Sequence, residues 1–303
     1  MNDSLGGRMK QYEAASAHTL MPRTPVMIRV DGRAFHTFTR ECQRPFDRDI
    51  IRAMVIAAQY TAADMAGFRL AYVQSDEATF LIDDLSSLQS QPWFGNKVHK
   101  LVSLSASLFT AAFNKAWPGT ELATFDSRAF SIPREDAPNA FVWRQRDWER
   151  NSLQMLAQSH FTHAQLQGKS HTEIHDMLHT RGVNWTRLTD QMKSGTFVLP
   201  GGDLRHDRID YAQVDAWIRE AQNTADETIA EPAPFQITHR PCPFCSVPLT
   251  VHAALANYQC RNPQCAHNGT FICLPIRRGR LYADRWEAIE DTRSPATTNG
   301  DTQ

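Results

Sequence analysis

Short apolar runs alternate with longer, helically spaced ones along the first half of the chain. The short runs are rich in β-branched residues and end at turn-forming residues, which is typical of buried strands. They lie at 25–30, 70–74, 79–82 and 123–132. Apolar residues three and four positions apart predict helices over about 47–66 and 96–115. In chain order this is β-α-β-β-α-β, which predicts an α+β fold with a ferredoxin-like core: a split βαβ antiparallel sheet with two helices on one face.

The second half of the chain has a different pattern. It is predicted to be mostly helical as far as about residue 195. Pro200-Gly201-Gly202 predicts a hinge, and the proline-containing segment 223–238 predicts a linker. The last residues are polar and are expected to form a disordered tail.

Composition narrows the class of protein. With 303 residues and 42% hydrophobic residues, the chain can bury a large core, which excludes a wholly disordered or fibrous protein. The net charge of -1 gives no global attraction to nucleic acid or membrane. No apolar run approaches bilayer length, and the N-terminus lacks the apolar segment of a signal peptide. Six cysteines are too few for a disulfide scaffold, so a reduced, cytoplasmic setting is expected.

Three carboxylates lie where the predicted strands end. Asp31 follows the first strand, and Asp76-Glu77 lies in the turn between the second and third. These strands are neighbours in a split βαβ sheet, so the carboxylates are expected to converge at one edge. Clustered carboxylates repel one another unless a cation neutralises them, and Mg²⁺ binds one or two carboxylates together with substrate phosphates.

Each of these segments alone is equally typical of an ordinary turn, because Asp-Gly is a common turn dipeptide. Taken together they favour a metal site for phosphoryl transfer. The loop 31–36 adds backbone N–H and C=O groups, the Arg33 guanidinium for phosphate and the Phe35 ring for a base.

The segments 28–38 (IRVDGRAFHTF) and 72–77 (YVQSDE) resemble the two signature motifs of the tRNA(His) guanylyltransferase family. These are reverse, 3′-to-5′ polymerases that add a nucleotide to the 5′ end of tRNA. Further matches are 125–128 (FDSR), 143–147 (WRQRD) and Asn151. The stretch from Asn151 to Trp185 is similar to the bacterial and phage branch, and the resemblance spans about residues 8–200.

The resemblance implies roles for particular residues. Asp31 and Asp76 would hold two Mg²⁺ ions with help from the Gly32 carbonyl, and Glu77 would complete the catalytic charge cluster. The nucleotide and its triphosphate would be bound by a set around both motifs: Asp31, Gly32, Arg33, Ala34, Phe35, His36, Arg44, Ser75 and Asp76. Two positions depart from the family. Ala34 stands where relatives usually have Asn, and Arg44 where they often have Lys.

The implied reaction has three steps. ATP or GTP activates the 5′-monophosphate of a tRNA, the 3′-hydroxyl of an incoming GTP attacks the activated phosphate, and pyrophosphate is removed. A homo-oligomer, dimer or tetramer, is expected. Alternatives are a template-dependent 5′-end repair polymerase for tRNA, a nucleotide cyclase-like enzyme and a non-catalytic RNA-binding relative. The chain is predicted to divide into a palm catalytic domain (1–135), a helical extension of it (136–222), a linker (223–239), a zinc ribbon (240–285) and a disordered tail (286–303).

The predicted ribbon rests on a cluster of cysteines. Cys242 and Cys245 are separated by 14 residues from the second pair, Cys260 and Cys265. Two such pairs can close a tetrahedron around one structural Zn²⁺. Chance clustering or disulfides are the alternatives, and Cys273, His252 and His267 are possible substitute ligands.

The charge of the same segment suggests a use for it. Residues 240–285 carry six arginines against the single acid Asp284, a net charge of +5. That surface is predicted to contact RNA phosphates. A docking role within an oligomer is the alternative.

Overall fold

A computed structural model describes residues 4–224 and, beyond them, Gln264 and short strand segments within 236–288. The predicted strands form a single antiparallel sheet in the order β4-β1-β3-β2, the ferredoxin-like order. The strands are β1 (Val26–Gly32), β2 (Phe68–Gln74), β3 (Glu77–Ile82) and β4 (Phe125–Ser131). Two short strands, β5 (Thr196–Val198) and β6 (Leu204–Arg205), extend it to six strands beyond β2. The α+β prediction is confirmed.

The two predicted helices cover one face of this sheet. They are α3 (Arg48–Asp64) and α4 (Val98–Ala116). Helix α3 begins where the Asp47 carboxylate accepts hydrogen bonds from the backbone N–H groups of Asp49 and Ile50, and thereby caps the helix. Alternate residues of the strands point into the core beneath these helices, as the period of two requires. Those of β1 are Val26, Ile28 and Val30.

The opposite face is also covered, which the sequence pattern did not predict. Helices α5 (Ala137–Gln158) and α9 (Tyr211–Thr224) lie over it. Met27, Tyr72 and Leu81 point away from α3 and α4 and pack with Phe141 of α5 and Ile218 of α9. The sheet is therefore the middle layer of three, and only its edges and strand ends remain available for a site.

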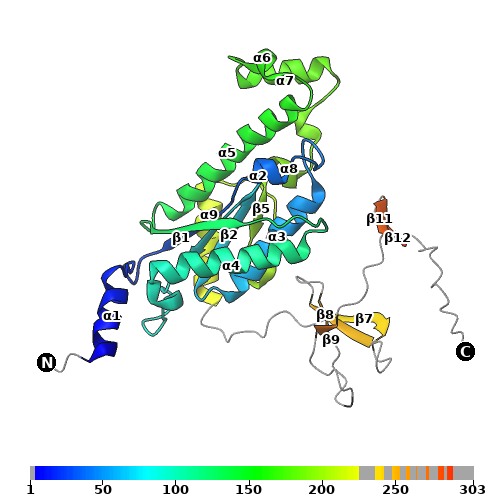
Figure 1. The fold of residues 1–303 in the computed structure, drawn as a ribbon. Coiled ribbons are helices and arrows are strands. Elements are labelled where there is room, and N and C mark those ends of the chain that lie inside the picture. The colour runs from blue at the N-terminus through cyan, green and yellow to red at the C-terminus, as the bar shows by residue number, and fades with distance from the viewer. Residues whose placement is uncertain are drawn as a thin grey trace, which may run out of the picture. The chain divides into compact units, whose positions relative to one another are not determined.

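Helix α5 continues beyond the sheet to a group of short helices, as Figure 1 shows. These include α6 (His163–Leu166) and α7 (His171–Thr180). The 3-10 turn η2 (Trp185–Arg187) follows, and then α8 (Asp190–Ser194), which lies near α2 (Phe35–Phe38) and accepts a hydrogen bond from Trp148 in the middle of α5. Leu153 and Leu156 of α5 pack against Ile174 and Leu178 of α7 in a separate small core. The helical character predicted up to about residue 195 is confirmed. The remaining helical elements are α1 (Leu5–Ala15), η1 (Trp93–Asn96) and η3 (Pro200–Gly202).

The chain divides into two units, residues 1–234 and 235–303. The second unit contains a four-stranded sheet in the order β10-β9-β8-β7 and a β11–β12 hairpin. Its strands are β7 (Gln236–Pro241), β8 (Pro248–His252), β9 (Asn257–Gln259), β10 (Phe271–Ile272), β11 (Gly279–Tyr282) and β12 (Arg285–Ala288). β12 runs past residue 286, where the tail was predicted to begin. The four cysteines predicted to bind zinc lie outside the described residues.

Candidate active site

Strand pairing brings the three predicted carboxylates to one end of β1 and β3. Asp31 on β1 is the register partner of Glu77 on β3. Ser75 and Asp76 form the turn between β2 and β3, and the Gly32 N–H donates to the Asp76 carbonyl at 3.0 Å. The antiparallel register thus places Asp31, Asp76 and Glu77 together at the same edge of the sheet.

Gly32 makes this close approach of the two segments possible. A Cβ atom at this position would clash with the Phe35 ring and lie 3.0 Å from the Asp76 Cβ. Two nearby residues have left-handed backbones: Ala34 with φ 50° and Ser75 with φ 46°. Such conformations are costly for residues other than glycine, asparagine and aspartate, and they cluster at functional sites.

The loop that follows β1 exposes Arg33, Ala34 and His36 to solvent. The Arg33 N–H donates to the Thr124 carbonyl at 2.9 Å, which fixes the loop against the start of β4. The Phe35 ring was predicted to meet a base. It is 7% exposed and packs among other aromatic rings in the core, and the part of it that remains accessible lines the α3-side cavity described below. Those rings are Phe38, Phe113 and Phe125.

The Asp76 carboxylate lies close to two other negative charges, those of Asp31 and Glu77. Burial raises its pKa above the ordinary value, and the charges of Asp31 and Glu77 raise it further, against hydrogen bonds from Ser75 and its own backbone that lower it. Within the described part of the chain, no ion pair with a cationic side chain is found for Asp76. Asp31 has one long cationic contact among the described residues, 3.7 Å from its Oδ2 to Nη2 of the exposed Arg128.

Glu77 is in the opposite situation, because cationic and hydroxyl donors surround it. Arg144 of α5 donates to both of its oxygens, from Nε to Oε1 at 2.8 Å and from Nη2 to Oε2 at 2.7 Å. Thr79 donates to Oε1 at 3.1 Å, and Arg29 Nη1 lies 3.8 Å from Oε2. A fork of this kind is among the stronger side-chain pairings in proteins.

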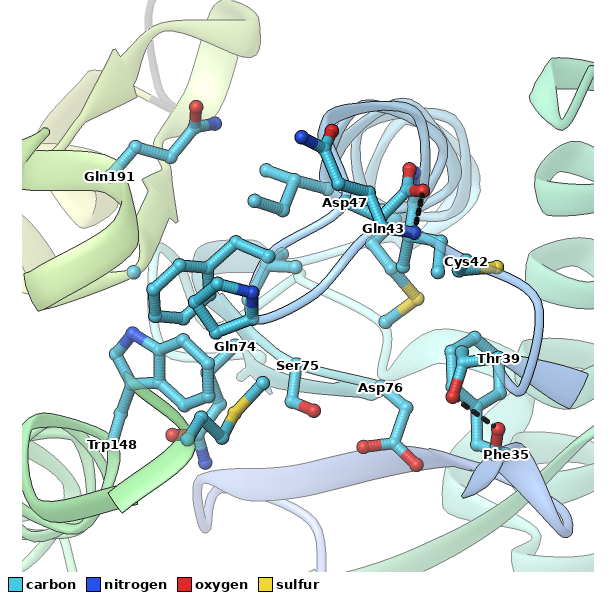
Figure 2. A pocket seen from close by; sticks show the side chains of 18 of the residues that line it. Phe35, Thr39, Cys42, Gln43, Asp47, Gln74, Ser75, Asp76, Trp148 and Gln191 are labelled. Atoms are coloured by element: carbon cyan, nitrogen blue, oxygen red, sulfur yellow. Dashed lines mark hydrogen bonds between the residues drawn. The ribbon is translucent and has the colours of Figure 1, made fainter. Parts of the chain in front are cut away.

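Two cavities meet at the Ser75–Asp76 turn. The first, of about 290 Å³, is lined by α3 and the segment before it, and is called here the α3-side cavity. Figure 2 shows Ser75 and Asp76 on its wall, with Gln43, Asp47 and Gln191 across from them. The second, of about 350 Å³, is lined by Asp31, Glu77 and one stripe of α5, and is called the α5-side cavity. That stripe consists of Arg144, Trp148, Asn151, Gln154, Met155 and Gln158.

The predicted nucleotide-binding residues divide between these cavities. Phe35, His36 and Arg44 line the α3-side cavity, Asp31 lines the α5-side cavity, and Ser75 and Asp76 line both. Gly32, Arg33 and Ala34 are not among the residues that line either cavity.

Comparisons with known proteins decide the family. The model of tRNAHis guanylyltransferase matches residues 6–133. The tRNA(His) guanylyltransferase of Schizosaccharomyces pombe is 31% identical over 208 residues, which cover 62% of this chain and 77% of that protein. The chain belongs to the tRNA(His) guanylyltransferase family. The resemblance predicted from the two signature motifs is confirmed, and members of this family are nucleotidyltransferases that depend on metal ions for catalysis.

Solved structures of bacterial members agree with the fold. A bacterial tRNA(His) guanylyltransferase-like protein in complex with ATP is 38% identical, with a TM-score of 0.68, over 71% of this chain and 99% of that chain. A bacterial tRNA(His) guanylyltransferase-like protein in complex with GTP is 33% identical, with a TM-score of 0.60, over 73% and 99%. None of the helices in the described parts of the chain is long and apolar enough to cross a membrane.

The residues at the turn fit the metal dependence of the family. Asp31 and Asp76 are carboxylates with little internal charge compensation, and a divalent cation would supply it. Among the residues that the structure describes, no three His, Cys, Asp or Glu side chains group as metal ligands. Mg²⁺ typically takes one or two protein carboxylates and fills its octahedron with waters and substrate phosphates, so the Asp31 and Asp76 carboxylates suit it.

Several residues of the site were not found by sequence reasoning. Gln43 and Asp47 come from the segment before α3, Gln191 from α8 and Thr196 from β5, and only the tertiary fold brings them to the α3-side cavity. The contribution of α5 to the α5-side cavity could be anticipated from the sequence, because the segment 143–147, which carries Arg144, is part of the family resemblance.

Proposed function

We propose that this enzyme adds a nucleotide, GMP from GTP, to the 5′ end of a tRNA in the 3′-to-5′ direction. ATP or GTP would first activate the 5′-monophosphate as an adenylylated or guanylylated end, with release of pyrophosphate. The 3′-hydroxyl of the incoming GTP would then attack the activated phosphate and release AMP or GMP, and pyrophosphate would finally be removed from the added nucleotide. The observation that carries the proposal is that the Ser75–Asp76 turn borders both cavities, with Asp31 beside it in the α5-side cavity. Two sites beside one pair of carboxylates suit a reaction that joins two phosphate-bearing substrates.

Asp31 and Asp76 would hold Mg²⁺ with the Gly32 carbonyl. When bound, the two ions would lower the pKa of the attacking hydroxyl and offset the charge of the leaving group. No side-chain nucleophile is needed, since the substrate hydroxyl forms the new bond. The residues of the chain bind and orient the two substrates.

The two cavities differ in chemistry, which supports a division of roles. Ile50, Met54 and Phe46 give the α3-side cavity an apolar wall that suits the faces of a base, and Arg44 at the same wall suits a phosphate. Asn151, Gln154 and Gln158 give the α5-side cavity carboxamides that can both donate and accept hydrogen bonds. We place one nucleotide in each, with phosphates meeting at Ser75 and Asp76. The related structures with ATP and with GTP support nucleotide binding in general.

The test of the proposed reaction is product analysis with labelled 5′-monophosphorylated tRNA, ATP and GTP. We expect a tRNA one nucleotide longer, and at least about a hundredfold loss of addition in Asp31→Asn and Asp76→Asn, since even residues behind metal ligands often contribute ten- to hundredfold. A cyclic nucleotide as the product, or tRNA binding without extension, would contradict it. Strong preference for 5′-truncated tRNAs would instead assign template-dependent repair.

For the second unit we propose a zinc ribbon that helps to hold RNA. The spacing of Cys242, Cys245, Cys260 and Cys265 supports one structural Zn²⁺ per chain. Elemental analysis of protein purified without added metal is expected to find one zinc. Full zinc retention in a Cys242→Ser/Cys260→Ser double variant would contradict the ligand assignment.

A further inference from the structure

Glu77 lies next to both proposed metal ligands, yet its oxygens are already engaged. It directly follows Asp76 in sequence and is the cross-strand register partner of Asp31. Both of its oxygens accept from the Arg144 fork, at 2.8 and 2.7 Å. The Glu77 side chain is only 11% exposed and that of Arg144 only 12%. To present both oxygens to a cation at the turn, Glu77 would have to rotate out of this fork and give up its hydrogen bonds to Arg144.

Arg144 is itself anchored, so the fork has a fixed direction. Its Nη1 donates to Asp147 Oδ2 at 3.1 Å, one turn along α5. When the amide oxygen and nitrogen of Gln74 are exchanged, which satisfies both, the oxygen accepts from the Arg144 guanidinium and the nitrogen donates to the Arg144 carbonyl at 3.3 Å. Arg144 therefore connects α5 to the last residue of β2 and the first of β3, on both sides of the Ser75–Asp76 turn.

We propose that Arg144 is a positioning residue that holds Glu77 out of the coordination shell of the cation. With Glu77 withdrawn, the site offers two carboxylates, and the remaining positions stay open to substrate phosphate oxygens. Without Arg144, Glu77 is free to turn toward the cation as a third carboxylate. The cation is then bound more tightly and catalysis is poorer. The inference rests on the proposed role of Asp31 and Asp76, and its test is designed to separate the two.

The experiment measures Mn²⁺ binding to the nucleotide-free full-length protein by electron paramagnetic resonance of free Mn²⁺. We expect Arg144→Met to bind Mn²⁺ about tenfold more tightly, because affinity for hard cations rises with the number of carboxylate ligands. In the same variant, nucleotide addition is expected to fall at least about tenfold. Adding Glu77→Gln to Arg144→Met is expected to return the Mn²⁺ affinity to that of the wild type.

Arg150→Met is the matched control. Arg150 pairs with Asp147 at 2.8 Å on the same helix and does not contact Glu77. It is expected to leave both Mn²⁺ affinity and nucleotide addition unchanged. General damage to α5 would lower Mn²⁺ affinity and activity together. Opposite changes in Arg144→Met alone are therefore specific to the release of Glu77.

Two further variants keep the test decisive. Glu77→Gln in an otherwise wild-type chain is expected to bind Mn²⁺ normally, whereas loss of affinity would make Glu77 a ligand and overturn the proposal. If Arg144→Met does not fold, the Mn²⁺ affinity of Glu77→Gln alone decides whether Glu77 is a ligand.

Unchanged or weaker Mn²⁺ binding in folded Arg144→Met would also overturn the proposal that Arg144 holds Glu77 away from the cation. Asp31→Asn is expected to lose binding; if it retains full affinity, the proposed metal site itself is wrong.

Discussion

Two residues without polar side chains shape the turn where the carboxylates meet. At Gly32 there is no space for a Cβ atom between Phe35 and Asp76, so only glycine fits without a shift of its neighbours. Ala34 adopts φ 50° and ψ 35°, a left-handed conformation, at the start of α2. These backbone requirements place Asp31 and Asp76 within one site, whereas their charges oppose it.

The repulsion between these carboxylates is expected to lower the stability of the folded protein, and a variant of Asp76 measures this effect. The pKa of Asp76 is raised by burial, and then by Asp31 and Glu77, so the charged form is disfavoured in the folded state. The resulting destabilisation is fully present above the raised pKa and disappears as the pH falls below 3.8, the ordinary value. We therefore expect Asp76→Asn to melt above the wild type at pH 7 without divalent metal, and the difference to vanish in acid. A lower melting temperature at pH 7 would show that Asp76 stabilises the fold.

Ala34 allows a second prediction at this scale. Asparagine tolerates the left-handed region better than alanine, whose cost there is about 1–2 kcal/mol. Ala34→Asn is therefore expected to increase the free energy of unfolding by about 0.5–1 kcal/mol. Ala63→Asn, at an exposed position inside α3, is the matched control and is expected to lose roughly 0.5 kcal/mol of stability through helix propensity. Equal effects in denaturant titrations of the two variants would contradict the backbone explanation.

At the scale of elements, the site depends on the β2–β3 hairpin and on α5. The hairpin was predictable, because two short apolar runs flank a turn, and so was its pairing with β1. The elements β5 and β6 were not, because they have three and two residues and are too short for a periodic signal. β5 exists because Ala71, Tyr72 and Val73 of β2 offer it an unpaired edge. The site residues Gln191 and Thr196 lie beside or within this strand and could not be predicted without it.

The α6–α7 segment offers a test of local helix chemistry. Ser170 caps α7 and donates from its backbone N–H and its hydroxyl to Glu173, each at 2.8 Å. These bonds, with Lys169, lower the pKa of Glu173 to about 2. The stabilisation by the charged Glu173 is present above the ordinary value of 4.5 and is lost as the pH falls through about 2.

Nuclear magnetic resonance titration of the Glu173 carboxyl is the measurement. We expect Ser170→Ala to raise this pKa toward its ordinary value, but only partly, because the backbone N–H of residue 170 remains a donor. Thr172→Ala, an exposed neighbour in the same turn, is expected to leave it unchanged. An unchanged Glu173 pKa in Ser170→Ala would exclude the hydroxyl as a cause.

At the scale of the whole molecule, the described active site lies entirely in the first unit. Asp31, Asp76, Glu77 and both cavities belong to residues 31–196. The fold of this unit followed largely from hydrophobic periodicity. Its three-layer form did not, because whether α5 and α9 cover the second face of the sheet depends on contacts between residues far apart in sequence, such as Tyr72 and Ile218.

A chain truncated after Pro234 tests the proposed use of the second unit. It lacks the segment with net charge +5 but retains the entire described site. We expect weaker tRNA binding and a log–log salt slope shallower by roughly 0.7–0.9 for each RNA phosphate that the shorter chain no longer neutralises, with turnover at saturating tRNA changed much less. Circular dichroism should first confirm that the truncated chain is folded. Equal affinities and slopes would assign the second unit to oligomer docking instead.

The central claim is that the chain extends a tRNA by attack on an activated 5′ phosphate. The most direct measurement compares two forms of one tRNA, with a 5′-monophosphate and with a 5′-triphosphate, each given GTP as the incoming nucleotide, with and without ATP. The triphosphate already carries a leaving group. The account therefore predicts one-nucleotide extension of the triphosphorylated tRNA without ATP, and faster extension of the monophosphorylated tRNA when ATP is added. Extension of neither tRNA, or an equal need for ATP by both, would contradict it.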